Sequence, residues 1–340
     1  MTEAMLYEKL SEQRVHCYLC AHNCVIENGK NGFCNVRQNR DGTLYTLVYG
    51  RTIAQHNDVI EKKPLYHFHP GSHALSVATP GCNFRCRWCQ NCEISQAPTA
   101  GHLAQGIEAS PEGLVKAALG CGSRSIAYTY TEPTVFFEYS YETAVAAHKN
   151  NLANVYVTNG FMTKEMLQTL HPCLDAAAVD LKAFRNETYK KYAGARLQPV
   201  LDSMKRLKEY GTWLEVITLV IPDLNDDPAE LRDIAGFIRD ELGPETPWHL
   251  SRFMPAYKMT GVPPTPAETL KRAKSIGLEE GLKYVYLGNL SGHSDTYCSE
   301  CGQVLVERSG YSKSTIKTTE DGKCSSCNTP LAGVGMGRPA

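Results

Sequence analysis

Short apolar runs alternate with amphipathic stretches through the middle of the chain, from about residue 74 to residue 290. Repeated strand–helix units of this kind are typical of a parallel sheet with right-handed crossovers. The apolar runs predict strands at residues 74–79, 125–130, 154–158, 175–181, 213–221, 248–253 and 283–288. Six or seven units fall short of the eight that close a full barrel, so the pattern predicts an α/β fold with a partial (β/α)6 TIM-like barrel. A doubly wound open sheet is the alternative.

Amphipathic helices are expected between these strands. The stretch 200–210 is the clearest, because Leu201, Met204 and Leu207 share one helical face. The other helices are predicted at 136–150, from residue 164, at 228–242 and at 266–276. The barrel is therefore expected to span 61–292, between small cysteine-rich, metal-binding appendages at 1–60 and 293–340. The glycine-rich tail 333–340 is expected to be disordered.

Polar residues follow the predicted strands at the points where they end. Parallel α/β folds form their active sites at this carboxyl edge, so a succession of polar strand ends indicates one shared site. The residues singled out for binding at this edge are Glu132, Asn159, Asp180, Lys182 and His249. For Asp180 and Lys182 the alternative is a surface ion pair, and for His249 it is a histidine satisfied within the core.

Cysteine is the unusual feature of the composition, because twelve of the 14 cysteines fall into groups and only Cys121 and Cys173 stand alone. The chain lacks a signal-peptide pattern at its N-terminus and an apolar stretch of membrane-spanning length, so a cytoplasmic protein without membrane contact is expected. In a reducing cytosol, clustered cysteines are metal ligands rather than disulfides. The net charge of −1 gives no support for a nucleic-acid partner.

Cys82, Cys86 and Cys89 form a Cys-x3-Cys-x2-Cys loop directly after the first predicted strand. Thiolates ligate iron–sulfur clusters, and three cysteines leave one iron of a cubane [4Fe–4S] cluster without a protein ligand. An open metal position permits catalysis, because a small molecule can bind there. The alternative includes Cys92 as a fourth ligand, as in the Cys-x2-Cys-x2-Cys run of ferredoxins, although the rest of that run is missing.

The spacing of this loop resembles the signature of the radical S-adenosylmethionine (SAM) superfamily, and Trp88 matches the aromatic residue usual before the third cysteine. The resemblance implies that SAM binds the open iron and that one-electron reduction yields a 5′-deoxyadenosyl radical. The implied cofactors are a [4Fe–4S] cluster and SAM. A flavodoxin- or ferredoxin-type electron donor is the expected partner.

Three further segments resemble glycyl-radical-enzyme activases such as the pyruvate formate-lyase-activating enzymes. The Tyr-Thr-Glu-Pro segment 130–133 is similar to the activase Gly-Gly-Glu-Pro segment, without its two glycines. The segments 158–160 and 180–182 match activase segments that line SAM. The resemblance implies that Glu132, Asn159, Asp180 and Lys182 help to bind SAM, and His249 is a candidate contact to SAM or substrate.

The whole set of motifs, over about residues 14–340, resembles the radical SAM enzymes of the AmmeMemoRadiSam system. The motifs that carry this resemblance are CYLCAHNCVIENGKNGFCNVR, GCNFRCRWCQN, YTEPT, DLKAF, IPDLND and YVYLGN. Partner proteins of that system are therefore expected. The resemblance does not establish a substrate.

Two outlying groups of four cysteines predict further metal sites. The N-terminal group has thiolates suited to zinc or to a second cluster, with a structural role preferred; it consists of Cys17, Cys20, Cys24 and Cys34. The C-terminal group predicts a zinc ribbon or a rubredoxin-like iron module, with zinc preferred; it consists of Cys298, Cys301, Cys324 and Cys327.

The sequence therefore predicts an oxidoreductase or activase-like enzyme that cleaves SAM reductively and abstracts hydrogen from a substrate. The closest specific role is activation of a partner protein through a backbone glycine, and the alternative within the class is modification of a small molecule or peptide. An alternative from another class is an iron–sulfur electron carrier or scaffold without SAM chemistry.

Overall fold

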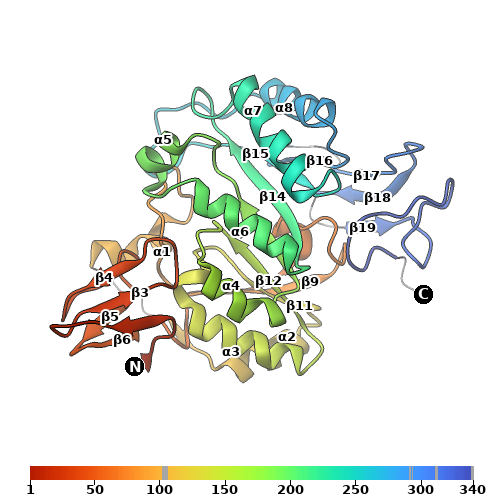
Figure 1. The fold of residues 1–340 in the computed structure, drawn as a ribbon. Helices are drawn as coiled ribbons and strands as arrows, with labels where there is room; N and C mark the ends of the chain where they lie inside the picture. Colours follow the sequence, from red (N-terminus) through yellow and green to blue (C-terminus); the bar gives the residue numbers. More distant parts are fainter. Residues whose placement is uncertain (102–105, 291, 293, 311–312, 338–340) are drawn as a thin grey trace.

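An eight-stranded sheet forms the centre of the protein in a computed structural model that describes residues 1–101, 106–290, 292, 294–310 and 313–337. Its strand order is β16-β15-β14-β13-β12-β11-β9-β8. The seven strands from β9 to β16 are parallel and lie side by side in chain order, whereas β8 pairs with β9 in the antiparallel direction (Figure 1). The fold is therefore α/β with a mainly parallel sheet, as predicted.

All seven predicted strands of this sheet are present. Their bounds are β9 His73–Ala78, β11 Ser125–Tyr128, β12 Ala153–Thr158, β13 Ala176–Asp180, β14 Trp213–Val220, β15 Trp248–Arg252 and β16 Val285–Gly288. The helices between them are α2 Pro111–Gly120, α3 Phe137–His148, α4 Lys164–Leu170, α6 Gln198–Glu209, α7 Pro228–Phe237 and α8 Ala267–Glu279, with shorter helical turns α1 Cys92–Ser95 and α5 Asn186–Thr188. None of the described helices combines the length and the apolar content that crossing a bilayer requires.

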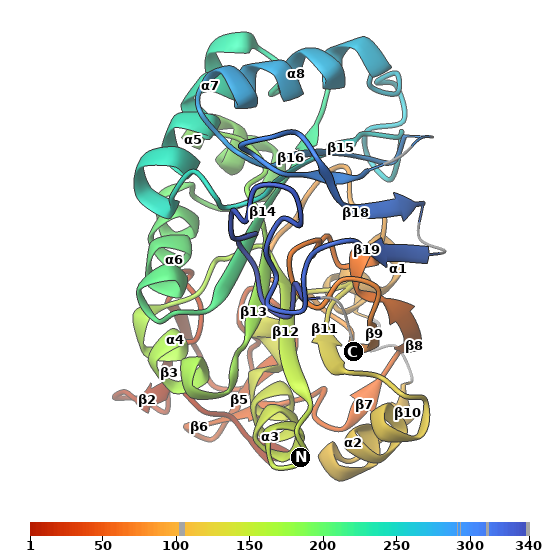
Figure 2. The ribbon, with the colours of Figure 1, turned by 90° about the vertical axis from the view of Figure 1, so that its right-hand side faces the viewer.

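The two faces of the sheet carry different side chains and pack against different parts of the chain. One face carries larger side chains, such as Tyr128 and Val216, which pack against the helices in the main core. These helices lie along one side of the sheet (Figure 2). The opposite face is rich in alanine, which leaves room for the segment 60–68 to pack against it through Ile60, Leu65 and Phe68. Burial of this apolar surface on both faces stabilises the sheet.

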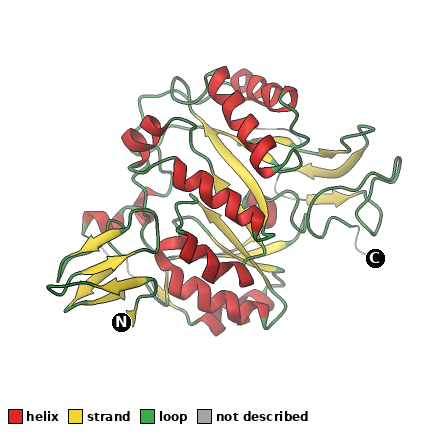
Figure 3. Ribbon diagram, in the orientation of Figure 1, coloured by secondary structure: helices red, strands yellow, loops and turns green. Residues whose placement is uncertain are grey.

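The N-terminal region forms two small antiparallel sheets that are separate from the central sheet (Figure 3). One contains β2 Tyr7–Lys9, β3 Val15–Cys17 and β4 Cys24–Ile26, and the other contains β1 Thr2–Glu3, β5 Arg37–Arg40 and β6 Thr43–Thr46. The strand β7 Arg51–Thr52 pairs with β10 Ile107–Glu108. The edge strand β8 Ala54–Val59 falls within the predicted segment 1–60 but belongs to the central sheet.

The C-terminal region forms a three-stranded antiparallel sheet of β17 Thr296–Tyr297, β18 Val304–Ser309 and β19 Lys313–Ile316. Its own core includes Leu305 and Met336 and continues into Tyr66 and Tyr286 of the central body. The expectation of a disordered tail is wrong for residues 333–337. Val334 forms a parallel bridge with Phe68, and its backbone exchanges hydrogen bonds with His67 and His69 at 2.9 and 2.8 Å. Residues 338–340 lie outside the described residues.

Candidate active site

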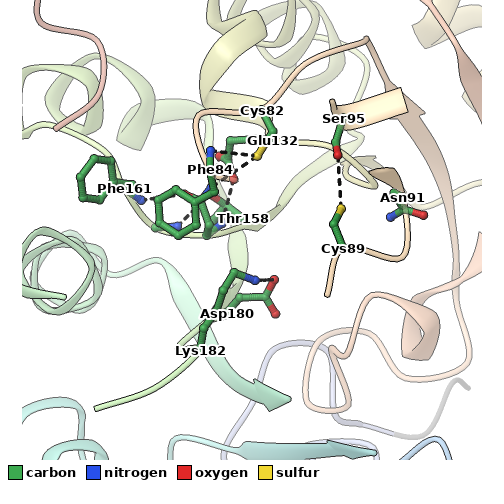
Figure 4. Close-up of polar contacts among 12 residues, drawn as sticks. Cys82, Phe84, Cys89, Asn91, Ser95, Glu132, Thr158, Phe161, Asp180 and Lys182 are labelled. Carbon is green, nitrogen blue, oxygen red and sulfur yellow. Dashed lines mark hydrogen bonds and ion pairs between the residues drawn. The ribbon is translucent and has the colours of Figure 1, made fainter. Parts of the chain in front are cut away.

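A cavity of about 310 Å³ lies at the carboxyl edge of the parallel strands. It gathers side chains from the ends of several strands, together with the loop that follows β9. Seven of the predicted site residues line it: Cys82, Cys86, Cys89, Glu132, Asn159, Asp180 and Lys182. Figure 4 shows Cys82, Cys89, Glu132 and the Asp180–Lys182 pair arranged around one space. The structure therefore joins motifs that lie up to 100 residues apart in the sequence.

The cysteine loop leaves the sheet at the end of β9 and is held by short-range contacts. The backbone N–H of Phe84 donates to Sγ of Cys82 at 3.3 Å, and the Ser95 hydroxyl lies 3.2 Å from Sγ of Cys89. The backbone N–H of Cys89 donates to the Cys86 carbonyl at 3.2 Å, which closes the turn between these two ligand candidates. Trp88 is buried and anchors this turn.

Cys92 does not line the cavity, although it lies three residues after Cys89. It begins the short helix α1, half-buried, beyond the turn that presents the other three thiols. Among the described residues, no cysteine other than Cys82, Cys86 and Cys89 lines this cavity. The donor set therefore fits a [4Fe–4S] cluster that takes three protein thiolates and keeps one iron open to a small molecule.

Burial controls the protonation of these thiols when no metal is bound. It raises the pKa of Cys86 to about 12, although the nearby Lys182 ammonium acts in the opposite direction. Burial also raises the pKa of Cys82 well above its usual range, and the Glu132 carboxylate adds to this shift. The thiolate is the form that binds metal, so metal binding at this site must release protons.

Glu132 is buried and joins the ends of two neighbouring strands. Its Oε1 accepts hydrogen bonds from the Thr134 and Thr158 hydroxyls, both at 2.7 Å, and its Oε2 accepts from the Asn159 backbone N–H at 2.8 Å. Burial raises the pKa of Glu132, and these donors oppose the rise. The carboxylate thus fixes the edge of the cavity that it lines, and Oε2 keeps capacity for another donor.

Tyr130 occupies the position of the first glycine in the activase segment, and its backbone has φ 63°, in the left-handed region that favours glycine. The chain therefore keeps a glycine-like turn here although a tyrosine is present. The Tyr130 hydroxyl donates to Asp58 at 2.5 Å, and its carbonyl accepts from the Asn91 side chain at 2.8 Å. These contacts hold the strained turn against β8 and the cysteine loop.

Asp180 and Lys182 form an ion pair at the cavity wall, with Nζ and Oδ2 3.0 Å apart. The Lys182 side chain is 15% exposed and the Asp180 side chain is 36% exposed, so the pair is half-buried at the cavity wall. Burial alone would lower the pKa of Lys182, but Asp180 and Cys86 outweigh it and raise the pKa. Asn225 braces the loop by donating to the Lys182 carbonyl at 2.7 Å. The Lys182 side chain therefore lies at the cavity wall together with the cysteine loop.

His249 does not line the cavity. It lies on β15, two residues before Ser251, which does line it. The imidazole is buried, with Nε2 2.6 Å from the Glu215 carboxylate and the ring stacked on Tyr286. The structure thus favours the alternative of a satisfied core histidine, because its interactions lie deeper in the sheet than the site.

Sequence reasoning missed the lysines that form another wall of the cavity. Lys62 and Lys63 line it from the turn after β8, and Nζ of Lys63 lies 2.8 Å from Asp58. The only signal was the charged run at 61–63, which follows a polar edge strand and is not part of the strand–helix repeat.

The four C-terminal cysteines converge as ligands of a single ion. Their sulfur atoms all lie within 4.8 Å of one another, and the pairs Cys298–Cys327 and Cys301–Cys324 are 3.5 and 3.6 Å apart. Tetrahedral coordination at the usual zinc–sulfur length of about 2.3 Å places sulfurs roughly 3.8 Å apart, so the donor set fits such an ion. Hydrogen bonds from Thr329 lower the pKa of Cys327 to about 6, which favours the thiolate.

The four N-terminal cysteines also lie close together, but they are arranged differently. Cys17 and Cys24 are directly opposite each other on β3 and β4, and Cys20 and Cys34 lie in neighbouring loops. Among the described residues, the C-terminal group is the only set whose ligand atoms all lie within 4.8 Å of one another. The N-terminal sulfurs are therefore more widely spread.

The fold, the three-cysteine loop and its cavity define an enzyme of the radical SAM class. A model of the Radical SAM superfamily matches residues 76–235, so this part of the chain is a radical SAM superfamily domain. A domain of this superfamily implies a [4Fe–4S] cluster and SAM as cofactors. The chain belongs to one family with the uncharacterized protein MJ0808 of Methanocaldococcus jannaschii, to which it is 46% identical over 97% of this chain and 99% of that protein.

More distant relatives agree with this class. The chain is 25% identical to the pyruvate formate-lyase 1-activating enzyme of Escherichia coli K12, over 61% of this chain and 89% of that enzyme. Among solved structures, Streptococcus suis SuiB bound to S-adenosylmethionine has a TM-score of 0.50 at 12% identity, over 68% of this chain and 53% of that one. This last similarity concerns the fold alone.

Proposed function

We propose that the protein cleaves SAM reductively and uses the product to abstract hydrogen from a substrate. The observation that carries the proposal is the convergence of three thiols, and no fourth among the described residues, on a cavity at the carboxyl edge of the sheet. A [4Fe–4S] cluster with SAM on its open iron supplies, after one-electron reduction, a 5′-deoxyadenosyl radical.

The residues that line the cavity have three roles, which are to bind the cluster, to bind SAM and to exclude water. Cys82, Cys86 and Cys89 hold the cluster. The charged and polar groups of the cavity bind SAM, whose ammonium, carboxylate and hydroxyl groups need partners of both signs; these groups are Glu132, Asn159, Asp180 and Lys182. The apolar lining, including Ile217 and Leu219, excludes water from the reacting centre.

The finer predictions remain part of this proposal. We propose a partial barrel, zinc at Cys298, Cys301, Cys324 and Cys327, and a flavodoxin- or ferredoxin-type reductant. The cysteine motifs support placement in the AmmeMemoRadiSam system, with partner proteins of that system. The many free cysteines support a cytoplasmic location, because clustered thiolates persist in reducing compartments.

The test is anaerobic reconstitution with iron and sulfide, followed by dithionite and SAM, with 5′-deoxyadenosine measured by mass spectrometry. Wild-type protein should form the product, and Cys89→Ala should form none because it loses a cluster ligand. Cys92→Ala is the matched control and should keep both cluster and product. Cluster-loaded wild type that leaves SAM intact would contradict the proposal, and loss of the cluster in Cys92→Ala would favour an electron carrier instead.

The similarity to an activating enzyme supports a glycyl-radical activase as the first candidate reaction. Co-expression with a candidate partner should then yield a glycyl-radical signal in electron paramagnetic resonance (EPR). Formation of 5′-deoxyadenosine with a small molecule or peptide, and no such signal, would instead support direct modification of that substrate.

A further inference from the structure

The spread of the N-terminal sulfur atoms distinguishes a single ion from a cluster. Four thiolates on one tetrahedral ion lie roughly 3.8 Å apart, as the C-terminal group does with its 3.5 and 3.6 Å pairs. Four thiolates on a [4Fe–4S] cube lie roughly 6 Å apart, because each binds a different iron. Among the described residues, Cys17, Cys20, Cys24 and Cys34 do not form a set within 4.8 Å, so their sulfur atoms are spread more widely than those of the C-terminal group.

The active-site cysteines provide an internal reference for this comparison. The radical SAM domain implies a cubane cluster at its three-cysteine loop. Cys82, Cys86 and Cys89 likewise are not a set within 4.8 Å among the described residues. The described part of the protein thus contains one set of cysteines whose sulfur atoms all lie within 4.8 Å of one another, and two sets that are spread more widely. Like the cluster loop, the N-terminal group is spread beyond this limit, and it has one thiol more.

A buried cation lies beside the N-terminal thiols. The Arg37 side chain is 2% exposed and donates through Nη2 to Glu138 at 2.7 Å. Among the described residues, its Nε and Nη1 have no hydrogen-bond partner. Arg37 begins β5, three residues after Cys34. Burial lowers the pKa of Arg37, but the neighbouring Cys17, with Glu138 and Cys34, raises it overall. Unpaired buried N–H groups suit the sulfur atoms of an anionic cluster.

The N-terminal group also packs directly against the cluster loop. His22 lies 2.7 Å from the Asn83 carbonyl, next to Cys82. Arg85 of the loop donates to the Phe33 carbonyl and stacks over the Phe33 ring. Gly81 has φ 107°, and a Cβ there would lie 2.7 Å from Val36, so only glycine allows this approach. The two cysteine groups are therefore held in one packed unit.

We propose that Cys17, Cys20, Cys24 and Cys34 bind a second, fully cysteine-ligated [4Fe–4S] cluster, and that Arg37 donates hydrogen bonds to it. The fourth thiolate leaves no open iron, so this cluster does not bind SAM. The proposal is independent of the proposed function, because it concerns a different set of ligands.

The experiment counts iron and acid-labile sulfide in the full-length protein after anaerobic reconstitution. Cys82→Ala/Cys86→Ala/Cys89→Ala should retain about four iron and four sulfide per chain, with an EPR signal after reduction that SAM does not alter. Sulfide distinguishes a cluster from rubredoxin-type iron, which contains none. Loss of all sulfide from this folded variant, with zinc in the N-terminal site, would overturn the proposal.

A second variant covers the case in which the triple variant does not fold. Cys17→Ser/Cys20→Ser/Cys24→Ser/Cys34→Ser should lower the wild-type content from about eight to about four iron and sulfide, with zinc unchanged. Cys324→Ser/Cys327→Ser is the matched control, and it should lose one metal ion without losing sulfide. Unchanged sulfide in the N-terminal variant, together with the loss of one zinc, would refute the second cluster.

Discussion

Arg37 and Glu138 form an ion pair that the fold encloses almost completely, with both side chains 2% exposed. Glu138 also accepts from the backbone N–H of Met5 at 2.6 Å, so the pair joins the N-terminal sheets to α3. Removing one member of such a pair leaves the other charge buried without compensation.

Arg37→Met should therefore lower the free energy of unfolding by about 3–5 kcal/mol. The exposed pair Arg185–Asp233, with side chains 44% and 47% exposed, supplies the control. Arg185→Met should change stability by less than about 1 kcal/mol. Denaturant titration of both variants measures the difference, and equal effects would show that burial does not determine the strength of the Arg37 contact.

Lys182 supplies the cation of the Asp180–Lys182 pair within the cavity. Lys182→Met removes a charged partner for SAM, and hydrogen bonds to charged groups are worth about 1.5–3 kcal/mol. The dissociation constant for SAM should rise by roughly tenfold or more, measured by equilibrium dialysis on cluster-loaded protein. Lys190→Met, at an exposed position of the adjoining helical turn, is the control and should leave SAM affinity unchanged. Equal SAM affinity in both variants would show that Lys182 does not contribute to SAM binding.

At the scale of elements, the C-terminal sheet is attached to the body by His67. Its Nδ1 lies 2.6 Å from the Ala332 carbonyl and its Nε2 lies 2.6 Å from the Tyr286 hydroxyl. Burial lowers the pKa of His67 to about 4, although Glu215 and the Ala332 carbonyl act in the opposite direction. Between about pH 6.5 and about pH 4, the folded protein therefore keeps the His67 ring neutral. In the unfolded chain the pKa of histidine is near 6.5, so the ring takes up a proton in this range.

This contribution to stability is complete above about pH 6.5 and is lost as the pH falls toward 4, because protons then favour the unfolded chain. The expected loss is up to about 3 kcal/mol across this range. His67→Gln should show a shallower decrease, measured by unfolding at several pH values with metal release followed in parallel. Identical pH profiles for the two proteins would assign the effect to other groups, such as His69, whose pKa is also lowered to about 4.

The sequence predicted the parallel strands because their apolar runs are long and bounded by turns, as in the buried strand β14. It missed β8, because Ala-Gln-His-Asn-Asp-Val has no period-two apolar pattern, and the neighbouring β9 supplies the pairing. The tail 333–337 was misjudged because glycine there permits close packing: a Cβ on Gly335 would lie 1.9 Å from His69. Such long-range contacts leave no local signal.

The candidate site was predictable where it rests on motifs at the ends of neighbouring parallel strands, as for Glu132 and Asp180. His249 could not be placed, because the alternation of a strand gives the face of a residue but not its depth below the sheet edge. Lys63 was missed because it reaches the cavity from an antiparallel edge connection.

For the whole molecule, an ion held by the proposed C-terminal cysteine site should stabilise more than its own sheet. The core around Leu305 and Met336 includes Tyr66 and Tyr286 of the central body. Cys324→Ser/Cys327→Ser should therefore lower the melting temperature of the entire protein by about 5 °C or more in calorimetry. A separate low-temperature transition, with the main transition unchanged, would instead show that the module unfolds independently.

The contact between His67 and Ala332 spans 265 positions of the chain. During synthesis His67 can form this contact only after almost all of the described chain has emerged from the ribosome. Val334, which bridges to Phe68, is made later still. The final packing around segment 60–68 is therefore a post-translational event, and a nascent chain that stalls before residue 334 presents this incomplete surface to chaperones and proteases.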